Sequence, residues 1–575
     1  MRAPLCAALV AIALGACGGA EQASPAAQPG AGQPAGSAAG RAIDPPAEPG
    51  SLAPRLARGE SGELLMTWVE PDPAGGHRIR FARRARGGWS APVTIASGPR
   101  VVASPVDAPA IAAAGGALLA SHAERPSGGG GGDHAQDVVL SRSADGGATW
   151  TRLGTPHRDG TATEHGFFSL IPRGFAVWLD GRATATGGPT ALRTAAASPP
   201  GAEQVLDDRV CDCCPTATAT TELGPIVVYR DRGEDEVRDI SIVRQVDGAW
   251  TAPAAVHRDG WRIEGCPVNG PAVAARGREV VVAWYTRAGD APRVLVAFSR
   301  DGGASFEPPA VVDAAQPDGR APAGQVDVAL DSGPTAIVSW LASRGEGSQV
   351  LVRRAAPGGG LGSVRALAAA PASRRAGIPR IASTEEGLVL AWTAGGEATR
   401  VRALAIAPRE IASVAQAPAG AMTAARPEVG ATVGRAAPDY RASGADGRAV
   451  TLADHRGEVV LLNLWATWCA PCKKEMPELA ELHRRYQTRG LRVIAVSLDA
   501  PEARERALEY VAAEKFPFAV WLDPDDRATQ VLAAPSLPVT LVLDRRGTIV
   551  FRRDGTITAA DAELVGAIEE ALAAR

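Results

Sequence analysis

Residues 459–479 read VVLLNLWATWCAPCKKEMPEL. The first seven of these residues are almost all apolar and predict a buried strand, and residues 471–489 carry the apolar spacing of a helix. Cys469 and Cys472 stand at the junction, so that a C-x-x-C pair opens the helix. A helix N-terminus presents free backbone N–H groups and a partial positive charge, which stabilise a thiolate. The stretch therefore predicts a redox-active cysteine pair on a strand–helix unit.

Strand and helix patterns continue to alternate after this stretch, within a domain expected to span residues 435–575. We expect further strands at 492–498, 518–522, 539–543 and 548–552, and helices at 502–514 and 558–573. Such alternation predicts an α/β domain built around a partly parallel sheet. Cys469, at the mouth of the helix, is expected to be the attacking thiolate, and Cys472, one turn further in, the resolving thiol.

The segment LNLWATWCAPCKKEMPEL at 462–479, with Leu-Pro-Val-Thr at 537–540, resembles the TlpA-like branch of thioredoxins. These are envelope thiol–disulfide oxidoreductases that serve cytochrome c maturation and related thiol reduction. The resemblance implies a thioredoxin-like fold in which Pro538 is a cis-proline that faces the disulfide and presents backbone to substrates. It also implies that Glu475 is a carboxylate near the active site, able to relay a proton of Cys472. The alternative for Glu475 is a surface residue paired with a lysine of the same helical turn.

The middle of the chain is a repeat of a proline, a small/apolar alternation, a turn, an apolar run and an aromatic residue. Clear copies span residues 54–68, 271–284 and 379–392. Together with weaker copies, the repeat ends at residues 68, 122, 178, 229, 284, 340 and 392, in steps of 51 to 56 residues. Units of four short strands at this period are propeller blades. Residues 51–415 are therefore expected to form an all-β propeller of seven blades, with six as the alternative.

Two turns of the repeat, at 143–150 and 299–306, have the form S-x-D-x-G-x-[ST]-[WF]. They resemble the Asp-box of sialidase-like (BNR) propellers, in which the carboxylate accepts backbone N–H bonds and glycine supplies a positive φ. The Arg-Ile-Pro of sialidases is missing from the sequence. A propeller that binds or cleaves glycans, with an accessory redox domain, is therefore kept as an alternative function.

The propeller contains a second group of cysteines, in loops that enter two neighbouring blades from the same face. We expect at least one disulfide between Cys266 and the segment 211–214 in oxidised protein; the alternatives are a thiolate site for Cu(I) or zinc, a redox-active pair and free thiols. The nearby arginines are expected to be salt-bridged scaffolding or, alternatively, a site for an anionic ligand. The residues concerned are Cys211, Cys213, Cys214, Cys266, Arg230, Arg232 and Arg238.

The N-terminus carries targeting signals. Residues 1–17 combine one arginine, a short apolar run and Leu-Gly-Ala-Cys, which predicts a signal peptide whose lipobox makes Cys17 the lipidation site. An ordinary signal peptide cut nearby is the alternative. Residues 18–50 are rich in Gly, Ala, Pro and Ser and predict a disordered tether, as residues 416–434 predict a linker. Gly18 after the cysteine favours the outer membrane of a bacterial envelope.

The 575 residues balance 60 basic against 63 acidic side chains, a net charge of −3, which argues against a nucleic-acid binder. We therefore expect a multidomain, lipid-anchored, periplasm-facing protein: a propeller followed by a thioredoxin-like domain. Its partners are expected to be protein thiol or disulfide substrates and an upstream electron donor. The Cys469–Cys472 disulfide is the only redox group expected, with no other cofactor unless copper or zinc binds at the propeller cysteines. A copper- and thiol-handling protein is the remaining alternative.

Overall fold

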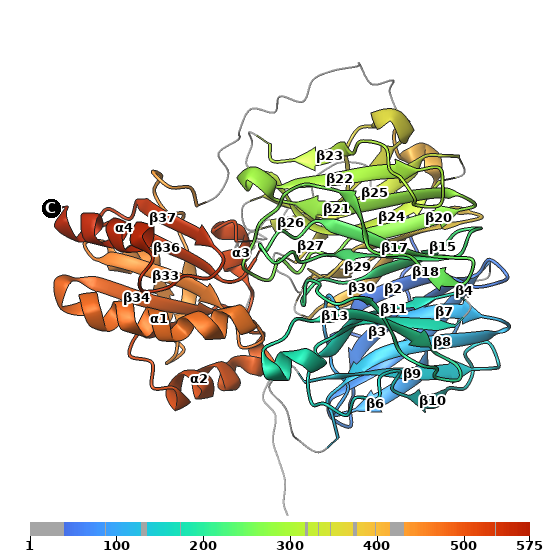
Figure 1. Ribbon diagram of the computed structural model, residues 1–575, viewed down its shortest axis with the longest axis horizontal. Coiled ribbons are helices and arrows are strands. Elements are labelled where there is room, and N and C mark those ends of the chain that lie inside the picture. Colours follow the sequence, from blue (N-terminus) through green and yellow to red (C-terminus); the bar gives the residue numbers. More distant parts are fainter. Residues whose placement is uncertain are drawn as a thin grey trace, which may run out of the picture. The chain divides into compact units, whose positions relative to one another are not determined.

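The computed structural model describes residues 40–574, except 87, 128–134, 173, 317–319, 332, 345–346, 372–375, 397, 414–430 and 535. Residues 39–575 form one compact unit, which contains an N-terminal propeller and a C-terminal α/β domain (Figure 1). The predicted signal peptide, Cys17 and most of the linker lie outside the described residues. No helix among the described residues is long and apolar enough to cross a membrane.

The first four blades are antiparallel sheets of four or five strands. Their strands are β2 (Leu52–Arg58), β3 (Leu64–Pro71), β4 (His77–Ala85), β5 (Gly88–Trp89) and β6 (Val93–Gly98); β7 (Ala110–Ala114), β8 (Ala117–Glu124), β9 (Asp137–Ser143) and β10 (Thr151–Gly154); β11 (His165–Ile171), β12 (Phe175–Asp180), β13 (Ala191–Ala196) and β14 (Gln204–Asp207); and β15 (Ala217–Thr220), β16 (Pro225–Arg230), β17 (Ile240–Val246), β18 (Ala249–Trp250) and β19 (Ala254–His257).

Three further blades complete the propeller. They consist of β20 (Ala272–Arg276), β21 (Glu279–Thr286), β22 (Arg293–Ser299) and β23 (Ala310–Ala314); β24 (Ala321–Leu330), β25 (Ala336–Arg344), β26 (Gly347–Ala355) and β27 (Arg365–Ala370); and β28 (Arg380–Thr384), β29 (Gly387–Ala394), β30 (Arg400–Ile406) and β1 (Arg41–Ala42). Short 3₁₀ turns lie between strands at η1 (Arg182–Thr186), η2 (Ala288–Asp290) and η3 (Pro357–Gly359), and after β30 at η5 (Pro408–Glu410).

The innermost strands close a ring of seven. β2, β7, β11, β15, β20, β24 and β28 contact one another in that order, and β28 contacts β2. This confirms seven blades and excludes six. The seven repeat-end residues all lie on the second strand of a blade and are buried, because a large side chain there fills the space between neighbouring sheets: Trp68, His122, Trp178, Tyr229, Trp284, Trp340 and Trp392.

The last blade is completed by the N-terminal end of the described chain. In β1, Arg41 and Ala42 pair with Ala405 and Leu404 of β30, and the Ile43 N–H donates to the Ala403 carbonyl at 2.9 Å. The structure therefore differs from the predicted tether over 18–50: its described part, from residue 40, belongs to the propeller. The sequence pattern could not predict this closing strand, because a single strand of two residues has no periodic signal.

The two predicted Asp-turns have the expected geometry. Asp145 accepts the Thr149 N–H at 2.9 Å, and Gly147 has a φ of 94°. In the second turn, the Ser305 N–H donates to Asp301 at 3.0 Å and Gly303 has a φ of 84°. These bonds tie each turn to its own blade, so the motif is a structural device rather than a site.

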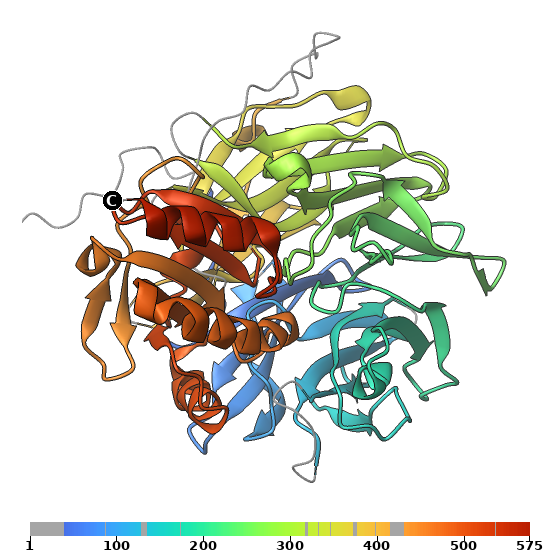
Figure 2. The ribbon, with the colours of Figure 1, turned by 60° about the vertical axis from the view of Figure 1, so that its left-hand side comes forward.

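The C-terminal domain is a seven-stranded mixed sheet in the order β32–β31–β35–β34–β33–β36–β37. Helices α1 and α4 lie side by side against it in both ribbon views (Figures 1 and 2), joined where the Tyr486 hydroxyl donates to Glu569 at 2.9 Å. The strands are β31 (Arg441–Gly444), β32 (Ala449–Thr451), β33 (Val459–Trp465), β34 (Leu491–Ser497), β35 (Ala519–Leu522), β36 (Val539–Leu543) and β37 (Ile549–Asp554). The helices are η6 (Leu452–His455), α1 (Ala470–Tyr486), η7 (Gln487–Arg489), η8 (Pro501–Ala503), α2 (Arg504–Ala513), α3 (Arg527–Val531) and α4 (Ala562–Ala573).

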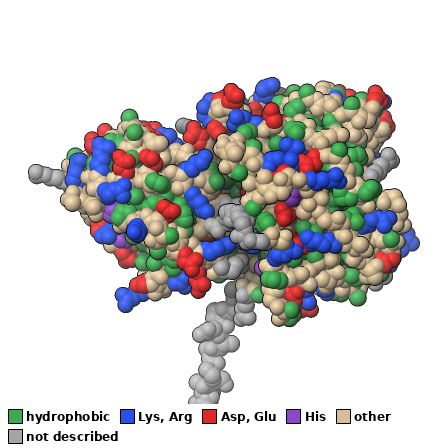
Figure 3. All heavy atoms as spheres, turned by 60° about the horizontal axis from the view of Figure 1, so that its bottom comes forward, with side chains coloured by type: hydrophobic (Ala, Val, Ile, Leu, Met, Phe, Trp, Pro, Cys, Tyr) green, Lys and Arg blue, Asp and Glu red, His purple; other side chains and the backbone are tan. Residues whose placement is uncertain are grey.

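The five predicted strands and three predicted helices of this domain are present, with ends that differ by a few residues. The hairpin of β31 and β32 and the short helix α3 were not predicted. Each is only three to five residues long, too short to show a period. On the face drawn in Figure 3, acidic and basic side chains are interspersed, in keeping with the near-zero net charge.

Candidate active site

The C-x-x-C pair lies where strand β33 passes into helix α1. Cys469 is the N-cap residue of α1, and its sulfur accepts the Cys472 backbone N–H at 3.2 Å. The two cysteines form a disulfide, and both are fully buried. The preceding loop is fixed by Asp499, which accepts the N–H and the hydroxyl of Thr467 at 2.9 and 2.6 Å. The sulfurs are thus held at a helix N-terminus, where a thiolate is stabilised.

Glu475 lies on the buried side of α1, one turn after Cys472. Only 1% of its surface is exposed, and its carboxylate accepts the Asn463 amide at 2.7 Å and the Ile557 N–H at 3.0 Å. Burial raises the pKa of Glu475 to about 8, against the lowering effect of these two hydrogen bonds. The alternative of a surface glutamate paired with lysine is therefore wrong. The protonated form of this side chain can hold or release a proton near neutral pH.

The Leu537–Pro538 peptide bond is cis, as the resemblance implied. The backbone of Leu537 forms an isolated antiparallel bridge with Cys266 of the propeller. The Cys266 N–H donates to the Leu537 carbonyl at 2.7 Å, and the Leu537 N–H donates to the Cys266 carbonyl at 3.3 Å. A cysteine-bearing segment of the propeller thus occupies the loop expected to receive substrates.

Contacts on either side hold this segment in place. The Thr556 N–H donates to the Glu264 carbonyl at 3.3 Å, and the Thr556 hydroxyl donates to the Glu264 carboxylate at 3.1 Å. Arg287 of the propeller forms a largely buried ion pair with Asp554 at the end of β37. Trp468, next to Cys469, packs against the propeller cysteines. The contact is therefore built from backbone, ionic and apolar groups together.

The four propeller cysteines are brought together as the repeat register predicted. The sulfur of Cys211 lies 3.0 Å from that of Cys214 and 3.8 Å from that of Cys213. The sulfurs of Cys213 and Cys266 lie within 4.8 Å of each other. All four are buried free thiols, so the expected bridge from Cys266 to segment 211–214 is not formed in this structure. Its formation in oxidised protein stays a prediction.

The thiols of this cluster differ in acidity. Burial alone would raise the pKa of Cys211, but hydrogen bonds from Cys213 and Cys214 and the positive charge of Arg238 hold it well below its ordinary value. The Arg238 guanidinium lies 3.3 Å from the Cys211 sulfur. Burial raises the pKa of Cys213 and Cys214 well above the ordinary value. The arrangement therefore favours one thiolate, at Cys211, flanked by two thiols.

The arginines otherwise act as scaffolding. Arg230 is 1% exposed and donates to the backbone carbonyls of Asn269, Arg238 and Tyr285 at 2.7–2.8 Å. Arg232 pairs with the Glu236 carboxylate at 2.7 Å. The alternative of an anion site is wrong for Arg230, because each of its three nitrogens already donates to a carbonyl.

A cavity of about 490 Å³ lies between the two cysteine groups. Trp468 and Ala470, the neighbours of Cys469, line it on one side, and Cys213 and Cys266 on the other. Burial raises the pKa of Asp107, another lining residue, to about 7. The cavity thus lies between the two thiol groups and contains a carboxyl able to exchange protons near neutral pH.

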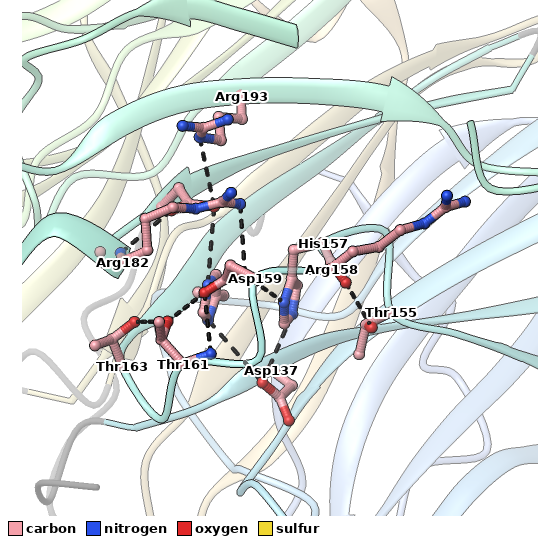
Figure 4. A network of polar contacts seen from close by, with 12 residues as sticks. Asp137, Thr155, His157, Arg158, Asp159, Thr161, Thr163, Arg182 and Arg193 are labelled. Atoms are coloured by element: carbon pink, nitrogen blue, oxygen red, sulfur yellow. Dashed lines mark hydrogen bonds and ion pairs between the residues drawn. The ribbon is translucent and has the colours of Figure 1, made fainter. Parts of the chain in front are cut away.

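Sequence reasoning missed two features of the structure. One is the Cys266–Leu537 bridge, which joins parts of the chain about 270 positions apart and has no local signal. The other is a buried group of two histidines and three aspartates at the start of the third blade (Figure 4): Asp137, His157, Asp159, His165 and Asp180. The short spacing of His157, Asp159 and His165 was the available signal for the second.

The geometry defines a class of protein: a thioredoxin-fold domain with its disulfide at a helix N-terminus and a cis-proline loop beside it. Residues 433–559 match the model of the AhpC/TSA family. The thiol-disulfide oxidoreductase ResA of Geobacillus thermodenitrificans is 36% identical over 131 residues, which are 22% of this chain and 73% of that protein. The chain belongs, through its C-terminal domain, to this family, and that domain is a thiol–disulfide oxidoreductase.

Other relatives match the same region. The thiol-disulfide oxidoreductase ResA of Bacillus subtilis is 30% identical over 125 residues, 22% of this chain and 69% of that protein. The crystal structure of a DsbF homologue from Corynebacterium diphtheriae is 26% identical and covers 24% of this chain and 85% of that chain, with a TM-score of 0.21.

Proposed function

We propose that this protein exchanges dithiol for disulfide with protein substrates through Cys469 and Cys472. A substrate thiolate attacks the Cys469 sulfur, and Cys472 leaves as a thiolate that Glu475 protonates. A second substrate thiol then displaces Cys469, which completes the transfer of two electrons. In the reverse direction, the Cys469 thiolate opens a substrate disulfide and Cys472 resolves the mixed disulfide.

One observation carries this proposal: the disulfide at the N-terminus of α1 stands beside a loop whose backbone already pairs with an extended, cysteine-bearing segment. Such pairing positions a sulfur by main-chain hydrogen bonds and makes few demands on the substrate's side chains. The test is insulin reduction by the full chain with dithiothreitol as electron source. Reduction well above the rate of dithiothreitol alone is expected; a rate equal to that background would contradict the proposal.

The proposed location is the periplasmic side of a bacterial envelope, with Cys17 as the lipid-modified anchor and the outer membrane favoured. An acyl chain contributes about 0.8 kcal/mol of membrane affinity per buried CH₂ group, so losing the modified cysteine should release the protein. We expect Cys17→Ala to move the protein from the membrane to the soluble fraction of cells, whereas Cys6→Ala should leave it in the membrane. Continued membrane association of Cys17→Ala would contradict lipid anchoring.

The propeller cysteines support a second candidate function, the binding of a soft metal. The sulfurs of Cys211, Cys213 and Cys214 lie within 4.8 Å of one another, and thiolates select Cu(I) and zinc. The test is the copper and zinc content of protein purified under reducing conditions. One equivalent of metal with sulfur ligands, lost in Cys211→Ser, would support metal handling; metal-free protein with titratable thiols would contradict it.

A further inference from the structure

We propose that the propeller is itself a redox partner of the thioredoxin-like domain within the same chain. Cys266 is the thiol that forms the mixed disulfide with Cys469, and Cys213 is the thiol that completes the exchange. The proposal rests on the proposed function of the Cys469–Cys472 pair and names a substrate for it.

The first argument is the position of Cys266. Its N–H and carbonyl both pair with Leu537, directly before Pro538, so that its backbone runs antiparallel to the substrate-receiving loop. Gly265, the preceding residue, lies so close to this loop that a Cβ there would come within 2.6 Å of the Leu537 carbonyl oxygen. A glycine at this position lets the two backbones approach closely. Gly265 thus allows the propeller segment to pack closely against the backbone of Leu537.

The second argument is that the disulfide is buried beside the propeller thiols. Cys469 is fully buried, and the propeller thiols share a cavity with its neighbours Trp468 and Ala470. A disulfide that is covered in this way is reached most directly by thiols that line the same cavity, whereas a protein substrate from solution has to displace the propeller segment first. The sulfurs closest to the substrate position are therefore those of the chain itself.

The third argument is the presence of a second thiol. Exchange needs one thiol to attack and another to resolve, and the Cys213 sulfur lies within 4.8 Å of the Cys266 sulfur. Because the two residues lie on loops that enter adjacent blades, the resulting bridge would cross-link blade four to blade five.

The steps balance in atoms and electrons. The Cys266 thiolate attacks the Cys469 sulfur, the Cys469–Cys472 bond breaks, and Cys472 leaves as a thiolate and is protonated. Cys213 then attacks the Cys266 sulfur, the Cys266–Cys469 bond breaks, and Cys469 leaves as a thiolate and is protonated. The propeller loses two thiol protons and two electrons and gains a disulfide, and the C-x-x-C pair gains both. The reverse sequence returns them.

The test traps the intermediate in the full chain. Reduced Cys472→Ser is given one equivalent of diamide, free thiols are alkylated, and the disulfide-linked peptides are mapped by mass spectrometry. We expect a Cys266–Cys469 link as the main product, absent from Cys472→Ser/Cys266→Ser and retained in the matched control Cys472→Ser/Cys214→Ser. If Cys469 bridges to another molecule or stays free while Cys266 is alkylated, the relay is wrong.

A second measurement uses no trapping variant. Fully reduced wild-type protein receives one disulfide equivalent of diamide, and the oxidised pairs are mapped at equilibrium. We expect both the Cys469–Cys472 and the Cys213–Cys266 disulfides, and in Cys266→Ser only the former. A wild-type protein that reduces insulin but never forms the propeller bridge would overturn the relay alone. A protein that does neither would overturn the proposed function as well.

A second inference concerns the buried histidines of the third blade, and it stands independently of the cysteines. We propose that Asp137, His157 and His165 bind a divalent transition metal such as zinc. Each of the three residues offers one ligand atom, a ring nitrogen or a carboxylate oxygen, and these atoms lie within 4.8 Å of one another. Imidazole and carboxylate are ordinary zinc ligands, and three of them leave a fourth position open.

The spacing of these atoms is close to that of zinc ligands, but the two imidazole rings are stacked in parallel with centroids 3.8 Å apart, so one ring has to turn for both nitrogens to bind one ion. The Asp137 oxygen lies 3.6 Å from the His157 Nε2 and 4.0 Å from the His165 Nδ1. Tetrahedral zinc with bonds of about 2.0–2.1 Å spaces its ligand atoms about 3.3–3.4 Å apart. These nitrogens lack a hydrogen-bond partner among the described residues, although His165 is fully buried and His157 nearly so. Buried imidazole nitrogens without partners are costly unless a ligand satisfies them.

Asp159 lies on the opposite side of both rings, at ion-pair distance and without hydrogen-bond geometry. One of its oxygens lies 3.3 Å from the His157 Nδ1 and 3.2 Å from the His165 Nε2 (Figure 4). Thr161 and Arg182 hold Asp159 in turn.

The charged side chains around the histidines carry a net negative charge, which favours the binding of a cation. Four carboxylates face two guanidinium groups around the histidines, a balance of −2. The arginines pair with Asp159, Asp180 and Glu203. The residues concerned are Asp137, Asp159, Asp180 and Glu203, with Arg182 and Arg193.

The test is zinc binding by full-length protein after dialysis against a chelator, read by isothermal titration and by X-ray absorption. We expect one zinc with nitrogen and oxygen ligands only, lost in His165→Gln but not in the control His257→Gln, whose ring is 42% exposed beside Asp259. Binding with sulfur ligands only, or unchanged binding in His165→Gln, would overturn the site. Equal melting temperatures of the metal-free wild type and variant show that the loss is not one of folding.

Discussion

Two groups of cysteines in one chain show how differently a thiol site can be built. Cys469 and Cys472 are separated by one helical turn, are joined in a disulfide and sit at the N-terminus of α1. The propeller thiols come from two loops about 50 residues apart and remain unbridged. A helix end favours the thiolate in the first group, and Arg238 favours it in the second. The first site is therefore local, and the second depends on the packing of two blades.

The largest expected effect separates the two groups by activity. Cys469→Ser removes the nucleophile and is expected to lower the rate of insulin reduction at least about 100-fold. Cys211→Ser, in the propeller, should retain most of the wild-type rate because this thiol does not touch the substrate-receiving loop. Equal losses in the two variants would mean that the propeller thiols take part in reduction of external substrates. A retained rate in Cys469→Ser would contradict its assignment as nucleophile.

The second prediction concerns the source of thiolate stabilisation in the propeller. Arg238→Gln removes the charge 3.3 Å from the Cys211 sulfur and is expected to raise the pKa of that thiol. The thiolate absorbance at 240 nm at pH 7 should fall by about one thiolate per chain. Arg232→Gln is the matched control, because that side chain pairs with Glu236 instead. Unchanged absorbance in Arg238→Gln would show that Cys211 is protonated in the wild type.

The third prediction tests whether the propeller covers the C-x-x-C pair. Arg287→Ala breaks the ion pair with Asp554, and the loss of roughly 1 kcal/mol of contact should speed alkylation of reduced Cys469 about fivefold. Arg278→Ala breaks an exposed ion pair with Glu222 elsewhere on the propeller and should leave the rate unchanged. Equal rates in the two variants would indicate that the contact does not limit access to Cys469.

The smallest expected effect is a change in pH dependence. The pKa of Glu475 is about 8 in the folded state and lies above its unfolded value. The free energy of unfolding is therefore expected to fall progressively as the pH rises from about 4.5 to 8. Above pH 8 its charge should also disfavour a nearby thiolate. In Glu475→Gln we expect alkylation of Cys469 to rise about threefold more between pH 7 and 9 than in the wild type. Glu481→Gln, exposed on the same helix, is the control, and matching profiles would exclude coupling.

The comparison also explains what could be predicted from the sequence. The disulfide, the start of its helix and Glu475 lie within seven residues, so one motif specified them. The blade count followed from large side chains such as Trp284 recurring at a fixed period. The pairing of Cys266 with Leu537 could not be predicted, because no local preference records a contact between loops of different domains. The close spacing of His157 and His165 is visible in the sequence. Their grouping with Asp137 is not, because Asp137 lies on the previous blade.

Strand β1 ties the beginning of the propeller to its end and so sets the order of folding. Its neighbour Asp44 pairs with Arg402, 358 positions later in the chain. The last blade stays incomplete until synthesis has passed β30. Until then β1 lacks its partner strand and exposes unpaired backbone groups. Loop closure over such a distance slows folding. Completion of the ring is therefore a late kinetic step, and a chain cut short before β30 would present an open, aggregation-prone edge.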